Sequence, residues 1–396
     1  MGFVGRKPTN APLTSDDIPN GIIGAADLAT GLAKLTWDTS VKTSGFTAVS
    51  NTGYFCNTTS AAFTVTLPAS PTAGDSIQLV DYAGTWDTNN LTINPNSQKI
   101  LAQTSNVLAI KDREAIRLVY IDTTQGWIPY SGYQEGTLGI GIPYSIDFLV
   151  IGGGGGGGSN YGGGGGAGGY RTSTQTVNPA TVITVTVGAG GISTDDGTNT
   201  ATSGSASSIS GSGLTTISSA GGGYGGGAAT GGGGSGGSGG GGAGQGGGGG
   251  AGNTPSTSPS QGNNGAAGSS DNAGGGGGAG EAGNTDGACA GGDGTASSIT
   301  GSSVTRAGGG AGRTSGGTGG AGGDGGGASG NTSATANTGS GGSGHIGGAV
   351  GSPASGVVIL SMPTASYSGT TTGSPTVTTS GSNTILQFNG SGSYTA

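Results

Sequence analysis

Carboxylate side chains that could form a catalytic pair are spread through the most unusual part of this 396-residue chain. Seven of them lie between residues 152 and 351: Asp195, Asp196, Asp271, Glu281, Asp286, Asp293 and Asp324. A glycan-cleaving enzyme would need two of them at a fixed separation across the scissile bond. Each one instead has Gly, Asn, Ser, Thr or Ala neighbours, which is the composition of turns. We therefore predict that the protein is not an enzyme, and a glycan depolymerase is the weaker alternative.

Residues that commonly bind transition metals are too few for a metal centre. Cys56 and Cys289 are far apart in dissimilar surroundings, and His345 is the single histidine. A zinc cluster needs four such ligands, usually at short spacings. We predict neither a metal nor a cofactor, and we expect both cysteines to be small buried side chains. His345 is expected to be a polar spacer, with a ligand contact as the alternative.

Glycine patterns in the chain match nucleotide-binding motifs by composition alone. The run "DFLVIGGGGGGG" begins at Asp147 and places G-x-G-x-x-G after an apolar strand. Such a motif needs a following helix whose N-terminus holds the phosphates. The next residues are instead Gly, Ser and Asn, which favour helices poorly, and the last lysine available to a Walker A loop is Lys111. Because the net charge is −8 and no basic stripe exists, nucleic acid is not an expected partner either.

The segment 46–144 carries the alternating pattern of a β-sheet. In "AFTVTLP" the side chains of Phe63, Val65 and Leu67 fall on one face, and threonines fall on the other. This pattern predicts a small β-sheet domain over 46–144. The preceding segment 1–45 is polar and rich in turns, so one copy cannot form a core. We expect it to fold by intertwining with copies of itself in a homotrimer.

Most of the 100 glycines lie between residues 152 and 351, in a block without Phe, Trp or Lys that cannot build a conventional core. A flexible linker is one interpretation. Three features favour a folded unit. They are the strand pattern "TVITVTV" at 181–187, the repeat of "GSASSIS" at Gly204 as "GTASSIT" at Gly294, and the strand "GVVIL" at 356–360, which mirrors "DFLVI".

Glycine can itself fold as packed polyglycine-II helices, each with three residues per turn. At ~3.1 Å per residue, seven glycines make a rod of ~22 Å whose N–H and C=O groups point outward to neighbouring rods. The longer runs are 152–158, 162–166, 231–234, 239–242, 246–250 and 274–278. The sequence thus predicts an all-β plus polyglycine-II fold. A glycine-rich sandwich bracketed by strands spans 145–362, and a C-terminal β-segment at 363–396 docks on it.

The stretches "DFLVIGGGGGGG", "GGAGGYRTS", "TVTVGAGG" and "SGVVILSMP" resemble the glycine-rich domain of tail-fibre and adhesin proteins of tailed bacteriophages. The region 46–130, with "GYFCNTTSAAFTVTLPASPTAGDSIQLVDYAGTWDTNN" and "DTTQGW", resembles a β-module of phage tail fibres, and 1–45 is similar to fibre N-termini. One departure is that "TILQFNGSGSYTA" ends this chain, whereas a similar strand commonly precedes the glycine run. We therefore expect this strand to dock beside Phe148–Ile151.

The resemblance implies a virion protein that attaches the phage to its host. The partners it implies are a host cell-surface polysaccharide or outer-membrane protein, phage baseplate or tail proteins at the N-terminus, and two further copies of the chain. The opening lacks the apolar core of a secretory signal, as expected for a protein made in the host cytoplasm and assembled into the virion. A purely structural fibre subunit that carries a separate adhesin is the alternative.

Receptor binding is expected at loops that link the rods at the end away from the strands. The polar insertions 253–273 and 329–340 offer varied amides, hydroxyls and a carboxylate. Three tyrosines could stack on sugars or, equally, pack against flat glycine faces. The predicted binding residues are Asn253, Thr254, Ser256, Asn263, Asn264, Asp271, Asn272, Asn331, Thr332, Asn337, Tyr161, Tyr170 and Tyr224.

Overall fold

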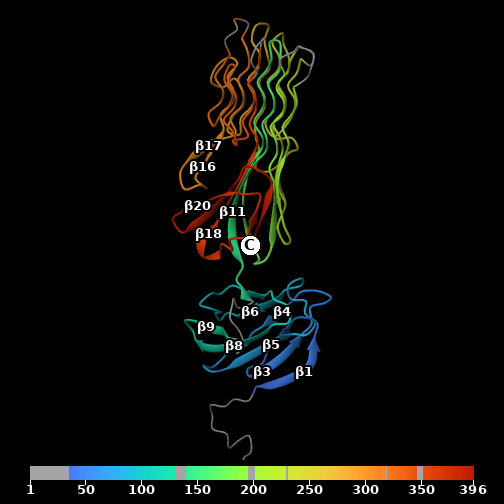
Figure 1. Cartoon of the computed structure of the whole chain (residues 1–396), viewed down its shortest axis with the longest axis vertical. Helices are drawn as coiled ribbons and strands as arrows, with labels where there is room; N and C mark the ends of the chain where they lie inside the picture. Colours follow the sequence, from blue (N-terminus) through green and yellow to red (C-terminus); the bar gives the residue numbers. More distant parts are fainter. Residues whose placement is uncertain are drawn as a thin grey trace, which may run out of the picture. The chain divides into compact units, whose positions relative to one another are not determined.

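A computed structural model of the chain describes residues 35–130, 140–194, 201–228, 231–314, 316, 319–345 and 351–396. It divides into two compact units, Met1–Gly141 and Ile142–Ala396, and strands are the main regular secondary structure of both (Figure 1). The described helical structure is one short 3-10 turn, Thr364–Ser366. In the part of the chain so described, no helix has the length and apolarity to cross a bilayer. The all-β class predicted from the sequence is confirmed.

The first unit contains two five-stranded sheets. One has the order β1 (Thr36–Lys42), β3 (Thr52–Cys56), β5 (Ser76–Asp81), β8 (Ala115–Asp122), β9 (Gly126–Tyr130). The other has the order β10 (Ile140–Gly141), β7 (Val107–Ala109), β6 (Leu91–Asn94), β4 (Phe63–Thr66), β2 (Phe46–Thr47). Val65 and Leu67 are fully buried, as their alternation with threonine predicts, and Phe63 is half-buried.

Strand β1 joins this unit although it comes from the predicted segment 1–45. It pairs in parallel with β3, and Trp37 stacks on Phe55 with ring centroids 5.0 Å apart. Contacts across the sheet therefore outweigh the polar composition that suggested a boundary at residue 45. Residues 1–34, which hold the rest of the predicted attachment segment, lie outside the described residues.

The second unit contains two further five-stranded sheets and a separate hairpin. One sheet has the order β12 (Tyr170–Val177), β11 (Tyr144–Ile151), β18 (Val357–Pro363), β21 (Asn383–Phe388), β20 (Thr376–Ser380), and is named the central sheet. The other has the order β15 (Ile217–Ser219), β14 (Ser207–Ser210), β13 (Val182–Thr186), β22 (Gly392–Thr395), β19 (Thr371–Thr372). The hairpin consists of β16 (Thr295–Ser297) and β17 (Val304–Arg306).

Both faces of the central sheet carry apolar side chains. Phe148 and its neighbours two residues away contact the sheet that contains β13, and Leu149 and Ile151 point to the opposite face. The strands "DFLVI" and "GVVIL", which bracket the glycine block in the sequence, are antiparallel neighbours as β11 and β18, with Phe148 opposite Leu360. The expectation that the C-terminal strand lies beside Phe148–Ile151 is wrong. Strand β21 pairs with β18 instead, because β18 already occupies that edge of β11.

The glycine run 152–158 continues β11 and forms hydrogen bonds with a period of three residues. The N–H groups of Gly152, Gly155 and Gly158 donate to one neighbouring segment, at the carbonyls of residues 169, 166 and 163. Those of Gly153 and Gly156 donate to a second segment, at residues 205 and 202. That of Gly154 donates to a third, at Ala354, over 2.9 Å. Strands alternate with a period of two, so this run is not a strand.

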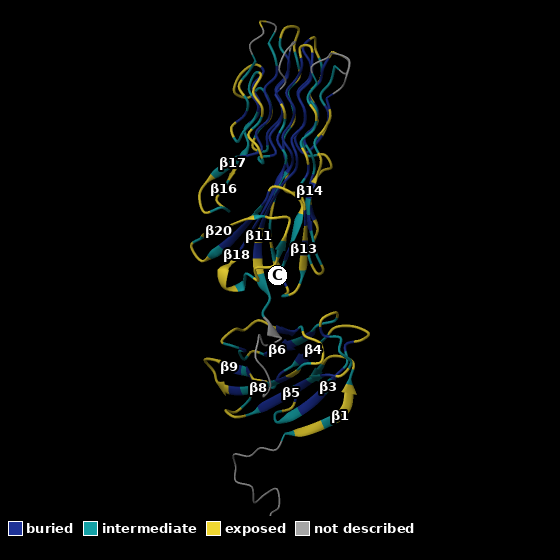
Figure 2. Ribbon diagram, in the orientation of Figure 1, coloured by how far each residue is buried: buried dark blue, intermediate teal, exposed yellow. Residues whose placement is uncertain are grey.

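The carbonyl groups of the same run follow the same period toward three other segments. Residues 153 and 156 accept from 222 and 225, residues 154 and 157 accept from 191 and 194, and residues 155 and 158 accept from 342 and 345. The run is thus surrounded by six segments, and all its glycines are buried (Figure 2). A flexible linker would leave its amides in water, so this run is not a linker.

Candidate functional site

The described glycine-rich segments between residues 152 and 356, here named the glycine layer, have two distinct ends. At the sheet end they join β11, β12 and β18, and at the far end they turn back (Figure 1). The turn Ser159–Tyr161 defines the far end, because it connects the run 152–158 to the run 162–169. Figure 2 shows buried runs in the middle of the layer and partly exposed turns at the far end.

Five of the predicted binding residues lie in far-end turns: Tyr161, Asp271, Asn272, Asn331 and Thr332. Three interactions connect these turns. The N–H of Gly244 donates to the Tyr161 carbonyl over 2.9 Å. Asn272 forms a β-bridge with Thr314, and a guanidinium nitrogen of Arg313 donates to Asn331 Oδ1 over 3.3 Å. We name Tyr161, Gln245, Asp271, Asn272, Arg313, Asn331 and Thr332 the far-end patch.

Tyr161 has an unusual backbone conformation in this patch. Its φ is 57°, that of the preceding Asn160 is 48°, and its side chain is 38% exposed. Asparagine adopts this left-handed region readily, but for tyrosine it costs roughly 1–2 kcal/mol. A strained aromatic residue at an exposed turn is a reason to suspect a binding role. The sequence placed Tyr161 among the candidates but missed Gln245 and Arg313, because nothing in their local spacing shows which turns meet.

Other predicted residues lie at the sheet end, so the expectation that both insertions project from the far end is wrong. The loop 253–261 begins where the N–H of Asn253 donates to the Gly237 carbonyl, and it ends where the Gln261 carbonyl accepts from Tyr170. It contains Thr254 and Ser256 as well. Asn337 is also at this end and accepts a hydrogen bond from Ser355 Oγ over 3.0 Å. The physical reason is that each insertion includes a segment that crosses the whole layer.

The remaining candidates serve the packing of the layer. The Asn263 amide donates to the carbonyls of Gly278 and Ala279, each over 3.1 Å, and Asn264 Oδ1 accepts from Gly252. The Tyr224 ring lies directly against Gly234. Tyr170 packs against the second apolar face of the central sheet, and burial raises the pKa of its phenol. For these two tyrosines the packing interpretation therefore describes the structure.

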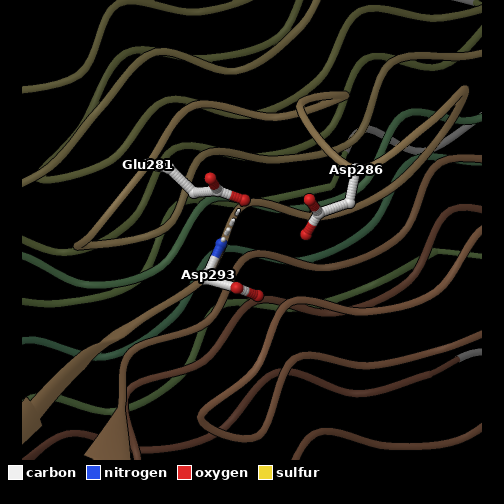
Figure 3. A group of neighbouring side chains, drawn as sticks. All are labelled: Glu281, Asp286 and Asp293. Atoms are coloured by element: carbon white, nitrogen blue, oxygen red, sulfur yellow. Dashed lines mark hydrogen bonds between the residues drawn. The ribbon is translucent and has the colours of Figure 1, made fainter.

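Three acidic residues come together where the sequence indicated separate turns. Ligand oxygens of Glu281, Asp286 and Asp293 all lie within 4.8 Å of one another (Figure 3). The Asp293 N–H donates to Glu281 Oε1 over 3.3 Å. Desolvation raises the pKa of Glu281, and the nearby carboxylates raise it further. Carboxylate oxygens are the ligands that hard divalent cations prefer, so these residues are the ones in the described chain that could hold such an ion.

The single histidine and the two cysteines are buried. His345 is 1% exposed at the far end, and neither ring nitrogen has a hydrogen-bond partner among the described residues. Cys56 and Cys289 are both buried and free, as predicted. Asp195 and Asp196 lie outside the described residues. His345 is therefore a buried side chain in this structure.

A comparison with protein families identifies the second unit. The family model described as "Glycine-rich domain" matches residues 134–363. The chain belongs to this glycine-rich domain family. The match extends through β10, β11, the glycine layer and β18, and it leaves β1–β9 and β19–β22 outside. No curated protein matches the chain.

Proposed function

We propose that this glycine-rich domain protein is a tail-fibre adhesin of a tailed bacteriophage. The observation that carries the proposal is the lattice of hydrogen bonds around the run 152–158, which ends in a row of varied polar turns. A lattice of this kind holds its turns rigidly, and preorganised binding groups lose little entropy on binding. The resemblance of the glycine run and of the 46–130 region to phage fibre modules supports the same function.

In this proposal the glycine runs are polyglycine-II helices. A period of three residues in both donors and acceptors is the symmetry of that helix, and β-strands cannot produce it. Ordered glycines lose more conformational entropy on folding than any other residue type. Hydrogen bonds to six neighbouring segments offset that loss.

The far-end patch is the proposed receptor site. It combines an aromatic ring, amides, a carboxylate and the Arg313 guanidinium on adjoining turns. This variety suits a surface polysaccharide or an outer-membrane protein, because each group recognises a different ligand atom. The glycine faces between the turns offer a receptor little to distinguish.

The rest of the chain has an assembly role in the proposal. The part of the predicted segment 1–45 that precedes β1 brings three copies together and connects them to baseplate or tail proteins of the virion. No catalytic step is proposed. The alternative of a structural subunit with a separate adhesin predicts that the purified chain does not bind cells.

Binding of the purified, fluorescently labelled chain to a panel of bacterial strains tests the proposal. We expect saturable binding to some strains, and we expect Tyr161→Gly to weaken it by about tenfold, since a central aromatic contact often contributes 1–2 kcal/mol or more. Glycine adopts the left-handed conformation of this turn without strain, so the turn should keep its backbone path in the variant. Ser256→Ala, at an exposed position of the sheet-end loop, is the control and should bind normally. Equal binding by both variants, or no binding to any strain, would reject the far-end site.

A further inference from the structure

The internal repeat places two related hairpins on opposite faces of the central sheet. "GSASSIS" at 204–210 leads into β14–β15, and "GTASSIT" at 294–300 leads into β16–β17. Ile209 of the first copy is buried in the cluster that contains Phe148. Ile299, its equivalent in the second copy, packs against the cluster that contains Leu149 and Ile385 on the other face.

The two hairpins differ in what lies beside them. Strand β14 pairs with β13, and β13 pairs with β22, so a complete sheet covers the first face. Among the strands that the structure describes, β16 pairs with β17 and with no other strand. The face of the central sheet beside the second hairpin is therefore left partly open. In Figure 1 this hairpin lies beside β18 and β20.

A pocket of about 490 Å³ occupies this open area. All five strands of the central sheet contribute to its lining, together with β16 and the following turn. Its volume is within the range of about 300–1,000 Å³ that is usual for small-molecule sites. The pocket is thus a direct consequence of the second hairpin lacking the neighbours that the first one has.

The chemistry of the lining selects the class of ligand. Thr174 Oγ1 donates to Asp147 Oδ1 over 2.6 Å, and the Asn383 amide donates to Ser361 Oγ over 3.4 Å. Hydroxyls of serine and threonine make up most of the remaining lining, and Ile299 and Ile385 give it an apolar wall. No lysine, arginine or histidine lines it, so an anionic ligand would have no counter-charge.

The geometry points to a neutral saccharide as the ligand of this pocket. The Asp147 carboxylate accepts hydrogen bonds, the Asn383 amide donates and accepts them, and the hydroxyls do both. A saccharide presents closely spaced hydroxyls on a partly apolar ring, which matches this set of groups and the isoleucine wall. The site is on the flank of the sheets and is separate from the far-end patch.

An added β-strand is the other occupant that the repeat suggests, because β13 fills the equivalent place on the first face. The side chains beneath the two places differ. Strand β13 buries Ile183 and Val185 against apolar residues. The open face instead presents Asp147, Ser361 and Asn383, and an apolar strand would leave the remaining hydrogen-bonding capacity of these side chains unused. The saccharide is therefore the better match.

Saturation-transfer NMR on the full chain tests this inference with a panel of neutral hexoses, N-acetylhexosamines and their disaccharides at about 10 mM, a concentration that detects millimolar affinity. We expect at least one sugar to bind and Asp147→Asn to weaken it by about tenfold or more, the usual cost of losing a hydrogen bond to a charged group. Ser298→Trp, a substitution on the exposed rim of the pocket, should block binding. Asp324→Asn makes the same charge change at an exposed turn outside both proposed sites and should leave sugar binding unchanged.

Other results would overturn the inference. The inference is wrong if no sugar binds, or if Asp147→Asn and Ser298→Trp bind the sugars as the wild type does. It is also wrong if no sugar binds and a synthetic "TVITVTV" peptide binds to the wild type but not to Ser298→Trp. The readout needs no bacterial cell or virion. Failure of the proposed adhesin function would leave sugar binding intact, and failure of the pocket would leave far-end binding to cells intact.

Discussion

Gly155 lies so close to Gly223 that a Cβ atom at residue 155 would overlap the Gly223 carbonyl oxygen. That oxygen also accepts the Gly166 N–H over 2.8 Å, so it cannot move away without breaking a bond of the lattice. The segments that contain residues 155, 166 and 223 thus meet at one point, where residue 155 has room for a hydrogen atom but not for a side chain. Glycine is required there by the approach of neighbouring chains.

Gly155→Ala should destabilise the second unit by about 2 kcal/mol or more, and Gly155→Val should prevent its folding, because overpacking a rigid interior commonly costs 1–3 kcal/mol per site. Gly248→Ala is the matched control, since no atom lies within 4 Å of a Cβ built at residue 248. It should change stability by less than about 0.5 kcal/mol. Thermal unfolding followed by circular dichroism measures both. Equal tolerance of alanine at the two positions would contradict the packed lattice.

Amides of the run 152–158 should exchange with solvent as slowly as those of strand β4, Phe63–Thr66. Every one of these N–H groups except that of Gly157 donates to a backbone carbonyl, and the Gly157 N–H donates to Ser193 Oγ over 2.9 Å. Exchange then requires opening of several neighbouring segments together. Hydrogen–deuterium exchange with mass spectrometry measures this. Complete exchange within seconds would mean that the run behaves as a linker in solution.

Much of this fold can be predicted from local patterns in the sequence. The alternation at Phe63–Leu67 and the apolar runs "DFLVI" and "GVVIL" report burial directly, because each side chain's face is set by its own position in the strand. The pairing of glycine segments cannot be predicted from the sequence in this way. One glycine run is chemically the same as another, so the sequence does not say that residue 155 meets residues 166 and 223.

The same limit explains the errors at the candidate site. The insertion 253–273 reads as one polar loop, yet its middle crosses the layer, so Asn253 and Asp271 lie at opposite ends. Arg313 and the acidic cluster were missed because their neighbours come from other turns. Turn composition predicts that a turn exists, and the lengths of the runs between turns decide which turns meet.

The Glu281 pKa predicts a pH dependence of stability. Its pKa is raised above the ordinary 4.5, so the folded protein binds this proton more tightly than the unfolded chain does. The stabilisation is present below pH 4.5 and is lost as pH rises through the raised pKa. Glu281→Gln imitates the protonated form, so its stability relative to wild type should increase over this window. Melting temperatures measured from pH 3 to about pH 7 test this, and parallel curves would contradict it.

The two cysteines should report unfolding of the two units separately. Burial raises the pKa of Cys56 to about 12, with a smaller contribution from Asp81, and burial also raises the pKa of Cys289. Because the thiolate is the reactive form, neither should react with iodoacetamide in the folded protein at mildly alkaline pH. In Gly155→Ala, Cys289 should become reactive at lower temperature than Cys56. Simultaneous labelling, identified by peptide mass spectrometry, would show that the units unfold together.

Host specificity should depend on the far-end turns and not on the sheet-end loop. Residues 159–161, 269–272 and 331–332 form adjoining turns, whereas the loop 253–261 is closed by its own hydrogen bonds, including Asn253 Oδ1 with the Thr257 N–H over 2.9 Å. Exchanging the far-end turns for those of a relative that binds another strain should transfer binding, because turns accept new sequence at a closure cost of only about 0.6 kcal/mol per doubling of length. Exchanging 253–261 alone should leave strain preference unchanged. If preference moves with 253–261, recognition occurs at the sheet end, where that loop adjoins Tyr170.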